Sequence, residues 1–366
     1  MYLCAKSFQR IFVQGFSRRG FAKEAVFEIE PYQLHRLDTG PSTRFTLTRK
    51  DALGYFKMMT GMRETGDAAQ KLFDQNYIRG LLHLCSGMEA VRAGVEAAIT
   101  SEDILVGTYR IHGWAYARGI PVEEILAEFL GKSTGRCKGK GGAMHLYSRN
   151  MLGGNGIIGA TVPLGTGVGF AMKYKKKPNV SISVYGEGAA NQGQIFEAFN
   201  MAKLWNLPCI YLCDNNVYSI STIAERVSAI TEFYTRGDYI PGLRVDGMDI
   251  LAVREAFVFA KRYALENGPI LVETMSYRYN GHSAKDEGLD YRKKDEIEHM
   301  KQTQDPIENF KERILKENLT DETELKHLVE EVTEEIQIAA EKVKEDKEPH
   351  RCSLYEDVYQ TEDYHT

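Results

Sequence analysis

The fold of this chain is decided by one stretch of its sequence, residues 179–216, which reads NVSISVYGEGAANQGQIFEAFNMAKLWNLPCIYLCDNN. Its first ten residues are rich in β-branched residues and end in a glycine turn, which is typical of a buried strand. Residues 191–206 repeat apolar side chains at helical spacing, so we expect a helix that packs on a sheet. Residues 208–216 predict a second buried strand. The apolar face of the helix comprises Ile195, Phe199 and Ala202, widened by Phe196 and Leu204.

Strands and helices continue to alternate on both sides of this stretch. Residues 103–110 predict a short strand, residues 249–268 a helix that stops at Gly268, and residues 269–279 a further strand. Strands that alternate with helices form βαβ units, so we predict an α/β fold with a doubly wound parallel sheet. Ligands of such sheets bind at the carboxyl ends of the strands.

The C-terminal part of the chain has a different pattern. Residues 320–349 begin with Thr320 ahead of acidic residues and continue as a charged amphipathic helix. We interpret this segment as a solvated helix that closes the domain. We therefore expect residues 23–366 to form one α/β domain, with a helical C-terminal extension from about residue 300.

Composition excludes several classes of protein. The chain has 366 residues, 43% of them hydrophobic, which is enough for a large core. Its net charge is −5 and its basic residues are dispersed, so no nucleic-acid partner is expected. No apolar run approaches the roughly 18 residues of a membrane span. The six cysteines include no CxxC pair, and Cys209 and Cys213 lie in an apolar run typical of core packing, which fits a reducing compartment.

Residues 1–22 have the composition of a mitochondrial transit peptide. They carry basic residues among serine and large apolar residues, and the first acidic residue is Glu24. A disordered basic tail is the alternative, but apolar and basic residues alternate here as an amphipathic helix requires. We expect cleavage near residues 18–22 and leave this segment out of the fold.

Two polar segments fall where the strands of the central stretch end. Glu187 lies within the glycine turn at residues 186–188, and Asn216 lies at the end of the following strand. A glycine turn that leads into a helix gathers main-chain N–H groups, which bind anions. Carboxylate and amide oxygens suit Mg²⁺, which usually shares its coordination shell with phosphate oxygens. The two strand ends therefore indicate a clamp for Mg²⁺ and a diphosphate.

From Glu187 to Asn216 the sequence resembles the cofactor motif of the alpha subunits of thiamine diphosphate-dependent 2-oxo acid dehydrogenases, a glycine–acid–glycine turn followed by paired asparagines. The resemblance runs from about Phe27 to Asp305 and includes RGLLHLCSGMEAVRAG, TYRIHGWAYARG, GGNGIIGATVPLGTG and YRYNGHS. Within this family, PGLRVDGMDILAVREA is more similar to the branch that acts on pyruvate than to the branched-chain one.

The resemblance implies a thiamine diphosphate-binding fold with thiamine diphosphate and Mg²⁺ as cofactors. An arginine fork on phosphate oxygens also makes physical sense independently of the family. The roles implied are ligation of Mg²⁺ by Glu187, Asn216 and the carbonyl oxygen of Tyr218, contact of Gly188 and Ala189 with the diphosphate, binding of that diphosphate by Tyr109 and Arg110, and contact of Gly156 and Ile158 with the aminopyrimidine.

The resemblance also implies a reaction, the oxidative decarboxylation of pyruvate, in which the cofactor acts as an electron sink. The acetyl group passes to the lipoyl domain of a dihydrolipoamide acetyltransferase. His83 and His282 would line the entrance to the reacting carbon, since histidine, with an unperturbed pKa near 6.5, can supply charge and protons there. A separate beta subunit supplies the activating glutamate, so we expect an α2β2 heterotetramer in the mitochondrial matrix.

The chain departs from the family at Glu187, where the family has aspartate. The extra methylene moves the carboxylate outward by about 1.5 Å. Mg²⁺ tolerates such a displacement poorly, but glutamate keeps the charge and the ligand type. We expect metal binding to be retained in altered form.

A second departure concerns regulation. The family has histidine at Asn280 and proline at Glu287. Of its three regulatory phosphorylation serines only Ser283 remains, because Asp290 and Ile223 occupy the other two positions. A phosphate adds nearly two negative charges. We therefore expect regulation at one site by a kinase and a phosphatase.

Two alternatives from other classes remain. The first is a non-catalytic paralogue that assembles with beta subunits, but the presence of His83, His282 and Arg110 speaks against it. The second is a dinucleotide-binding oxidoreductase. It is disfavoured because no GxGxxG follows the first strand, and because Glu187 would repel a pyrophosphate unless a cation intervened.

Overall fold

The chain folds around one seven-stranded sheet, seen here in a computed structural model that describes residues 20–358. Residues 1–19, and with them nearly all of the predicted transit peptide, lie outside the described residues. The strands are β1 (Glu24–Glu28), β2 (Gln33–His35), β3 (Arg44–Thr48), β4 (Ile104–Thr108), β5 (Met151–Asn155), β6 (Ser181–Gly186), β7 (Cys209–Asn215), β8 (Tyr218–Ser219), β9 (Thr222–Ile223), β10 (Gly242–Asp246) and β11 (Ile270–Met275).

The large sheet has the order β2-β10-β11-β7-β6-β4-β5 and is parallel except for β2. The predicted α/β fold with a doubly wound parallel sheet is therefore confirmed. The antiparallel edge strand β2 belongs to the N-terminal arm, which reaches the sheet from outside rather than through a helical crossover, so its direction is not constrained. Two small antiparallel pairs, β1 with β3 and β8 with β9, accompany the sheet.

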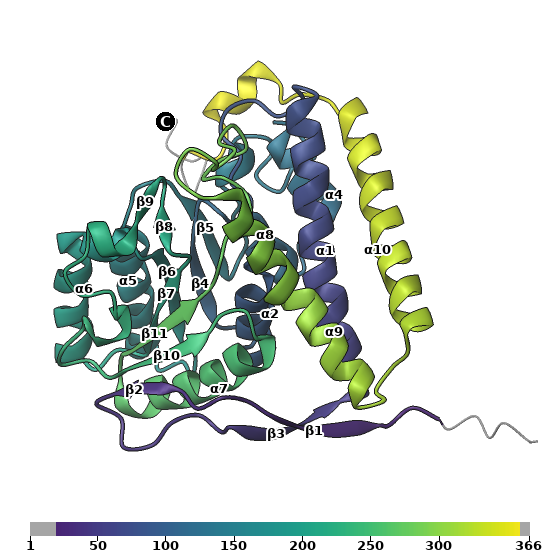
Figure 1. Cartoon of the computed structure of the whole chain (residues 1–366). Coiled ribbons are helices and arrows are strands. Elements are labelled where there is room, and N and C mark those ends of the chain that lie inside the picture. Colours follow the sequence, from purple (N-terminus) through teal and green to yellow (C-terminus); the bar gives the residue numbers. More distant parts are fainter. Residues whose placement is uncertain (1–19, 359–366) are drawn as a thin grey trace, which may run out of the picture.

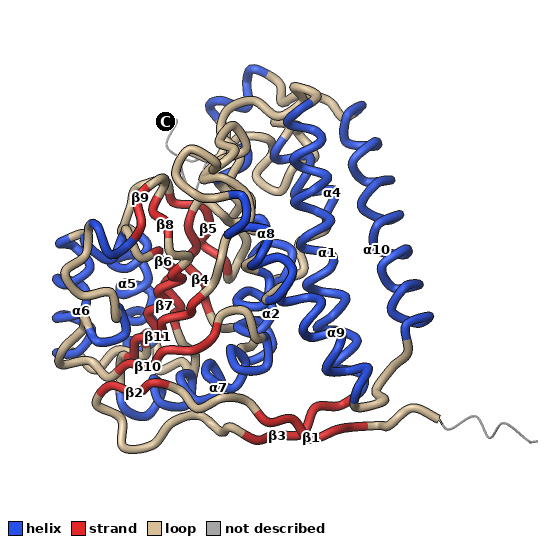
Figure 2. Tube along the Cα trace, in the orientation of Figure 1, coloured by secondary structure: helices blue, strands red, loops and turns tan. Residues whose placement is uncertain are grey.

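Helices cover both faces of the sheet (Figure 1; Figure 2). One face packs against α5 and α6, and the other against α7 and α2, with α1, α9 and α10 stacked outside α2. The helices are α1 (Arg49–Asp74), α2 (Glu89–Ala98), α3 (His112–Ala117), α4 (Val122–Phe129), α5 (Thr161–Tyr174), α6 (Gly193–Leu204), α7 (Ile250–Asn267), α8 (Lys294–Thr303), α9 (Pro306–Lys316) and α10 (Glu322–Lys342).

Alternate side chains of the central strands enter two separate cores. In β7, Ile210 and Leu212 join the core beneath α2 and α7, whereas Cys209, Tyr211 and Cys213 join the core beneath α5 and α6. Both faces of a parallel strand are buried in this way, which is why β7 is apolar at nearly every position. The predicted core packing of the two cysteines is confirmed.

The helix of the central stretch is shorter and less deeply buried than its sequence suggests. It begins at Gly193, and Ile195, Phe199 and Ala202 are buried as predicted. The prediction that Phe196 and Leu204 widen the buried face is wrong, because these side chains are 37% and 72% exposed. Among the described helices α6 packs mainly on α5, so a narrower apolar stripe is enough to seat it.

The C-terminal region is helical from Lys294, close to the predicted boundary. Helix α10 packs along α1 and α4. Its N-cap is Asp321, because the Asp321 carboxylate accepts a hydrogen bond of 2.8 Å from the Glu324 amide. The hydroxyl of Thr320 instead donates to the Glu324 side chain at 2.6 Å.

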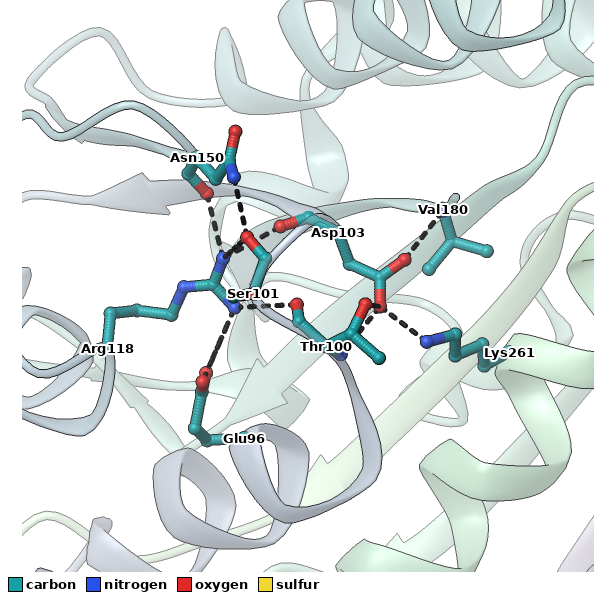
Figure 3. A network of polar contacts seen from close by, with 8 residues as sticks. All are labelled: Glu96, Thr100, Ser101, Asp103, Arg118, Asn150, Val180 and Lys261. Atoms are coloured by element: carbon teal, nitrogen blue, oxygen red, sulfur yellow. Dashed lines mark hydrogen bonds and ion pairs between the residues drawn. The ribbon is translucent and has the colours of Figure 1, made fainter. Parts of the chain in front are cut away.

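The amino ends of the strands are locked by a partly buried polar network (Figure 3). Asp103, which precedes β4, accepts hydrogen bonds from the Val180 amide at the start of β6 and from Thr100, and it pairs with Lys261 of α7 at 2.6 Å. The side chain of Arg118, at the end of α3, pairs with Glu96 at 3.2 Å. Arg118 also donates to the main-chain carbonyls of Thr100, Ser101, Asp103 and Asn150.

The network fixes β4, β5, β6 and α7 relative to one another at one edge of the sheet, since Asn150 directly precedes β5. At the opposite edge of the sheet, the carboxyl ends of the strands lead into loops. The order of the strands places a topological switch point between β4 and β6, because the chain leaves β4 outward to β5 and leaves β6 inward to β7. Ligand sites of open α/β sheets lie at such points.

None of the described helices combines the length and the apolar composition that a membrane span requires.

Candidate cofactor and active site

A cavity of about 260 Å³ opens at the carboxyl ends of β4, β6 and β7, beside the switch point. The structure brings most of the predicted site residues together around it. His83, Gly156 and Ser283 are not among its lining residues. The predicted residues that line the cavity are Tyr109, Arg110, Ile158, Glu187, Gly188, Ala189, Asn216, Tyr218 and His282.

Glu187 directly follows β6 and is 2% exposed. Its carboxylate accepts hydrogen bonds from the Ser219 hydroxyl at 2.9 Å and from the main-chain amide and the side-chain amide of Asn216, both at 3.2 Å. Burial raises the pKa of Glu187, and these hydrogen bonds oppose the rise. The carboxylate is therefore held in one position by groups from the next strand end.

Asn216 and Tyr218 lie on a tight turn after β7. Asn215 holds this turn, because its side-chain oxygen accepts a hydrogen bond of 3.1 Å from the Val217 amide. Val217 has a φ of 75°, which is strained for a β-branched residue and marks a turn held by its surroundings. The amide nitrogen of the Asn216 side chain faces Glu187, and its oxygen accepts a hydrogen bond from Arg278 at 3.3 Å.

The donors at this point suit a divalent cation. Glu187 offers a carboxylate and Tyr218 a main-chain carbonyl, whereas Asn216 offers its amide oxygen only if its hydrogen bonds to Glu187 and Arg278 are given up. Among the described residues no three His, Cys, Asp or Glu side chains gather into a metal cluster. Asp214 also lines the cavity, but its carboxylate is paired with Arg92.

The turn from β6 to α6 offers a close approach to the main chain. A short 3₁₀ turn, Ala189–Asn191, follows Gly188, and α6 starts at Gly193. A Cβ added at Gly188 would lie 2.2 Å from the Ser219 hydroxyl oxygen, so only glycine fits there. The main-chain N–H groups and the small residues of this turn are suited to bind an anion that also contacts a cation.

Gly156 and Ile158 lie on the loop that follows β5. Ile158 lines the cavity and is 45% exposed, and its neighbour Ile157 is more exposed still. Gly156 has open space around its Cα, since an added Cβ would meet no atom within 4 Å. This loop forms an apolar, solvent-facing rim of the cavity.

Arg110 connects two loops that carry the histidines. Its guanidinium donates to the carbonyl of Leu84, next to His83, at 2.7 Å and to the carbonyl of His282 at 2.8 Å. Burial among other cations lowers the pKa of Arg110 to about 10, so the group stays charged at neutral pH. It places a buried positive charge at the wall of the cavity, where Tyr109 also lies.

His83, Tyr109 and His282 form an aromatic cluster, in which the ring centroid of His83 lies 4.6 Å from that of Tyr109 and 5.2 Å from that of His282. Arg110 donates to His282 Nδ1 at 3.3 Å, so that nitrogen accepts and the proton of the neutral ring lies on Nε2. Burial and the charge of Arg110 lower the pKa to about 3 for His83 and to about 4 for His282. Both rings are neutral at pH 7.

His282 belongs to a loop that Asp286 organises. The Asp286 carboxylate accepts hydrogen bonds of 2.7 Å from the His282 amide, the Gly288 amide and the Tyr291 hydroxyl. Ser283 is half-buried in the same turn, and its carbonyl accepts a hydrogen bond from the Asp286 amide at 2.9 Å. Of the positions where the family has its other phosphorylation serines, Asp290 is exposed and Ile223 lies in β9.

Several residues of the site were not found by reasoning from the sequence. Asp214 and Arg92 form a buried ion pair of 2.7 Å beneath the cavity, and Asp214 also accepts a hydrogen bond from Ser276. Ser219 was missed because the motif was followed only as far as Tyr218. The spacing of Asp286 and Gly288 was available as a turn signal.

The fold and this site define a class of protein. The chain belongs to the dehydrogenase E1 component family, whose model matches residues 57–352. It is 50% identical over 345 residues to the human pyruvate dehydrogenase E1 component subunit alpha, somatic form, mitochondrial, covering 94% of this chain and 88% of the relative. It is 47% identical to the probable mitochondrial alpha subunit of Caenorhabditis elegans, covering 98% and 91%, and 46% identical to the type II alpha subunit of Ascaris suum, covering 95% and 89%. The dinucleotide-binding alternative is therefore not retained.

Proposed function

We propose that this chain is the alpha subunit of a mitochondrial pyruvate dehydrogenase E1 component, an oxidoreductase that decarboxylates pyruvate and transfers the acetyl group to the lipoyl domain of dihydrolipoamide acetyltransferase. Relatives with this name, about 50% identical over most of the chain, support the proposal. The single observation that carries it is the meeting of Glu187, Asn216 and Arg110 around one cavity at the strand ends.

Thiamine diphosphate, when bound, supplies the electron sink that a 2-oxo acid needs to lose CO₂. In this chain Gly188 and Ala189 would contact its diphosphate, and Tyr109 and Arg110, which line the same cavity, would also hold it. Gly156 and Ile158 would lie along its aminopyrimidine. The fit is supported by the buried charge of Arg110, which has no carboxylate partner among its hydrogen bonds.

Glu187, Asn216 and the carbonyl oxygen of Tyr218 would hold Mg²⁺, with the longer carboxylate of Glu187 in place of the family's aspartate. This proposal is supported by the hard-oxygen chemistry of the three groups and by the fixed position of the Glu187 carboxylate.

The histidines would act on the substrate side of the cavity. His282 carries its proton on Nε2 and offers it as a donor, while Arg110 orients the ring from Nδ1. An anionic ligand beside Arg110 would offset the guanidinium charge and raise the pKa of both histidines toward the range of proton transfer. His83, behind the Tyr109 ring, would help to exclude water from that side.

The partner would be a pyruvate dehydrogenase beta subunit in an α2β2 heterotetramer. Exposed apolar side chains support such an assembly. Ile157 and Ile158 form an apolar rim at the cavity, which fits a site that a second subunit completes. The outer faces of α5 and α6 add Leu164, Phe170, Tyr174 and Leu204.

The compartment would be the mitochondrial matrix. The relatives are named mitochondrial, and the predicted transit peptide at residues 1–22 supports import.

Regulation would act through Ser283, by a pyruvate dehydrogenase kinase and phosphatase. A phosphate on Ser283 would add negative charge to the turn that the Asp286 carboxylate organises, and like-charge repulsion would open the loop that carries His282. In the co-expressed tetramer, phosphorylation of the natural chain by such a kinase should abolish activity, and Ser283→Ala should resist. An alanine variant that the kinase still inactivates would overturn single-site regulation.

The proposed function is tested by CO₂ release from labelled pyruvate, with added thiamine diphosphate and Mg²⁺, by this chain co-expressed with a pyruvate dehydrogenase beta subunit. The natural tetramer should release CO₂, the chain alone should not, and Glu187→Asp should need less Mg²⁺. If only the Asp variant worked, the natural chain would be an assembled but non-catalytic subunit. If neither worked, the function would be wrong.

A further inference from the structure

We propose that Ser219 is a positioning residue of the cation site, acting by holding the Glu187 carboxylate in the place from which it can reach Mg²⁺. This inference rests on the proposed function of the cavity and adds a residue that neither the motif nor the family resemblance assigned. Its basis is the hydrogen bond of 2.9 Å from the Ser219 hydroxyl to Glu187 Oε1.

The two oxygens of the Glu187 carboxylate have different hydrogen-bond partners. Asn216 donates only to Oε2, from its main chain and its side chain. Ser219 is the group that the hydrogen bonds place on Oε1. Without the hydroxyl, Oε1 of a side chain that is 2% exposed would lose this donor while its burial remained. Ser219 therefore controls one of the two oxygens that a cation could use.

The backbone of Ser219 is fixed well enough for such a role. It lies on β8, which pairs with β9 in register, Ser219 opposite Thr222. The residue packs directly on the glycine turn, since a Cβ at Gly188 would lie 2.7 Å from the Ser219 Cβ. The hydroxyl is thus presented to Glu187 by a hairpin that also carries Tyr218.

The length of Glu187 makes this hydroxyl matter. An aspartate at this position would withdraw the carboxylate by about 1.5 Å, one C–C bond, and take it beyond hydrogen-bonding distance of Ser219. Glutamate has one more rotatable bond and more freedom to lose. The hydrogen bond from Ser219 restricts the rotation of the Glu187 side chain, so the effects of the two residues are coupled. An aspartate at position 187 would not make this hydrogen bond and would gain nothing from the serine.

The test is a double-substitution cycle on the co-expressed α2β2 tetramer, using the natural chain, Ser219→Ala, Glu187→Asp and the double variant. Equilibrium dialysis measures thiamine diphosphate retained at stepped MgCl₂ concentrations, which reports metal-dependent binding without turnover. We expect Ser219→Ala to raise the Mg²⁺ concentration for half-maximal retention by about tenfold or more, as for a lost hydrogen bond to a charged group. In the Glu187→Asp background the same change should raise it less than about twofold.

Two further variants separate positioning from general damage. Ser219→Thr keeps a hydroxyl and should restore most of the Mg²⁺ affinity. Ser221→Ala removes a hydroxyl from the exposed turn of the same hairpin and should change nothing. Each tetramer without cofactor should still unfold cooperatively, and Ser219→Ala should lower its melting temperature by no more than the loss of one hydrogen bond to the buried Glu187 explains.

An unchanged Mg²⁺ requirement in Ser219→Ala, or an equal shift in both backgrounds, would overturn the role of Ser219 and leave the proposed function intact. If the natural chain and Glu187→Asp both retained no thiamine diphosphate at any Mg²⁺ concentration, the proposed function would fall and this inference with it.

Discussion

The main-chain amide of His282 donates a hydrogen bond of 2.7 Å to the carboxylate of Asp286. The same carboxylate binds the Gly288 amide and the Tyr291 hydroxyl, so one acid organises the loop that presents His282 to the cavity. Although burial alone would raise the pKa of Asp286, these hydrogen bonds lower it, and the group is ionised at neutral pH.

Replacing Asp286 with alanine should therefore loosen the loop and displace His282. We expect kcat/KM for pyruvate to fall by about tenfold or more, as for a misplaced catalytic group, together with faster cleavage of the loop by trypsin. The control is Asp290→Ala, which removes an exposed acid from the same loop and should leave both measurements unchanged. Equal effects of the two substitutions would show that loop charge, rather than the Asp286 contacts, is what matters.

Two glycines, one lining the cavity and one at the start of α6, offer a matched pair. A Cβ at Gly188 would lie 2.2 Å from the Ser219 hydroxyl oxygen, whereas a Cβ at Gly193 would meet no atom within 4 Å. Gly188→Ala should weaken thiamine diphosphate binding by roughly tenfold or more, because the turn must shift away from Ser219. Gly193→Ala should bind it normally. Calorimetric titration of the tetramer measures both, and tight binding by the Gly188 variant would contradict the site.

The packing of α2 on α7 can be tested in the same way. A Cβ at Gly94 would lie 2.7 Å from the Val253 Cβ and 2.9 Å from the Ile250 carbonyl oxygen. Gly94→Ala should cost about 1–3 kcal/mol of stability through overpacking. Gly54→Ala, in an open position of α1, should instead add up to about 1 kcal/mol. Urea unfolding of the purified tetramer distinguishes the two signs.

Acid should destabilise the protein through His112. Burial, with the charges of Arg92 and Arg110, lowers the pKa of this ring to about 3, against 6.5 in the unfolded chain. Below pH 6.5 the unfolded chain therefore binds a proton that the folded chain does not, and stability falls as the pH falls toward 3. The slope for one such group is at most about 1.4 kcal/mol per pH unit.

His112→Asn removes this slope while keeping the other titrating groups. The variant should be less stable at pH 7, yet its melting temperature should fall less than that of the natural protein between pH 7 and pH 5.5. If the melting temperatures of the two proteins changed identically with pH, His112 would bind its proton equally well in the folded and the unfolded chain.

The sequence predicted those parts of the molecule that depend on local pattern. β6, α6 and β7 were found because apolar periodicity and a glycine turn fall within one short stretch, and parallel alignment then required Glu187 and Asn216 to meet. The exposure of Phe196 and Leu204 could not be predicted, because it depends on how many helices surround α6.

The remaining parts of the site arise from long-range contacts. The hydrogen bonds of Arg110 to Leu84 and His282 join residues that no local pattern relates. The ion pair of Arg92 with Asp214 likewise forms only when α2 crosses the end of β7. Ser219 directly follows the last residue assigned from the motif. Its role could not be predicted from the sequence, because a serine after a strand has many possible hydrogen-bond partners.

The two edges of the sheet imply two kinds of inherited defect. A change at Arg118 or Asp103, far from the cavity, would leave the chemistry intact and remove folded subunits, so its severity would rise with temperature and ease in the cold. A change at Gly188 would leave an abundant subunit that binds its cofactor weakly, so its loss of activity would respond to the supply of thiamine and magnesium. The edge of the sheet on which a residue lies therefore indicates whether its substitution lowers the amount of folded subunit or the affinity for cofactor.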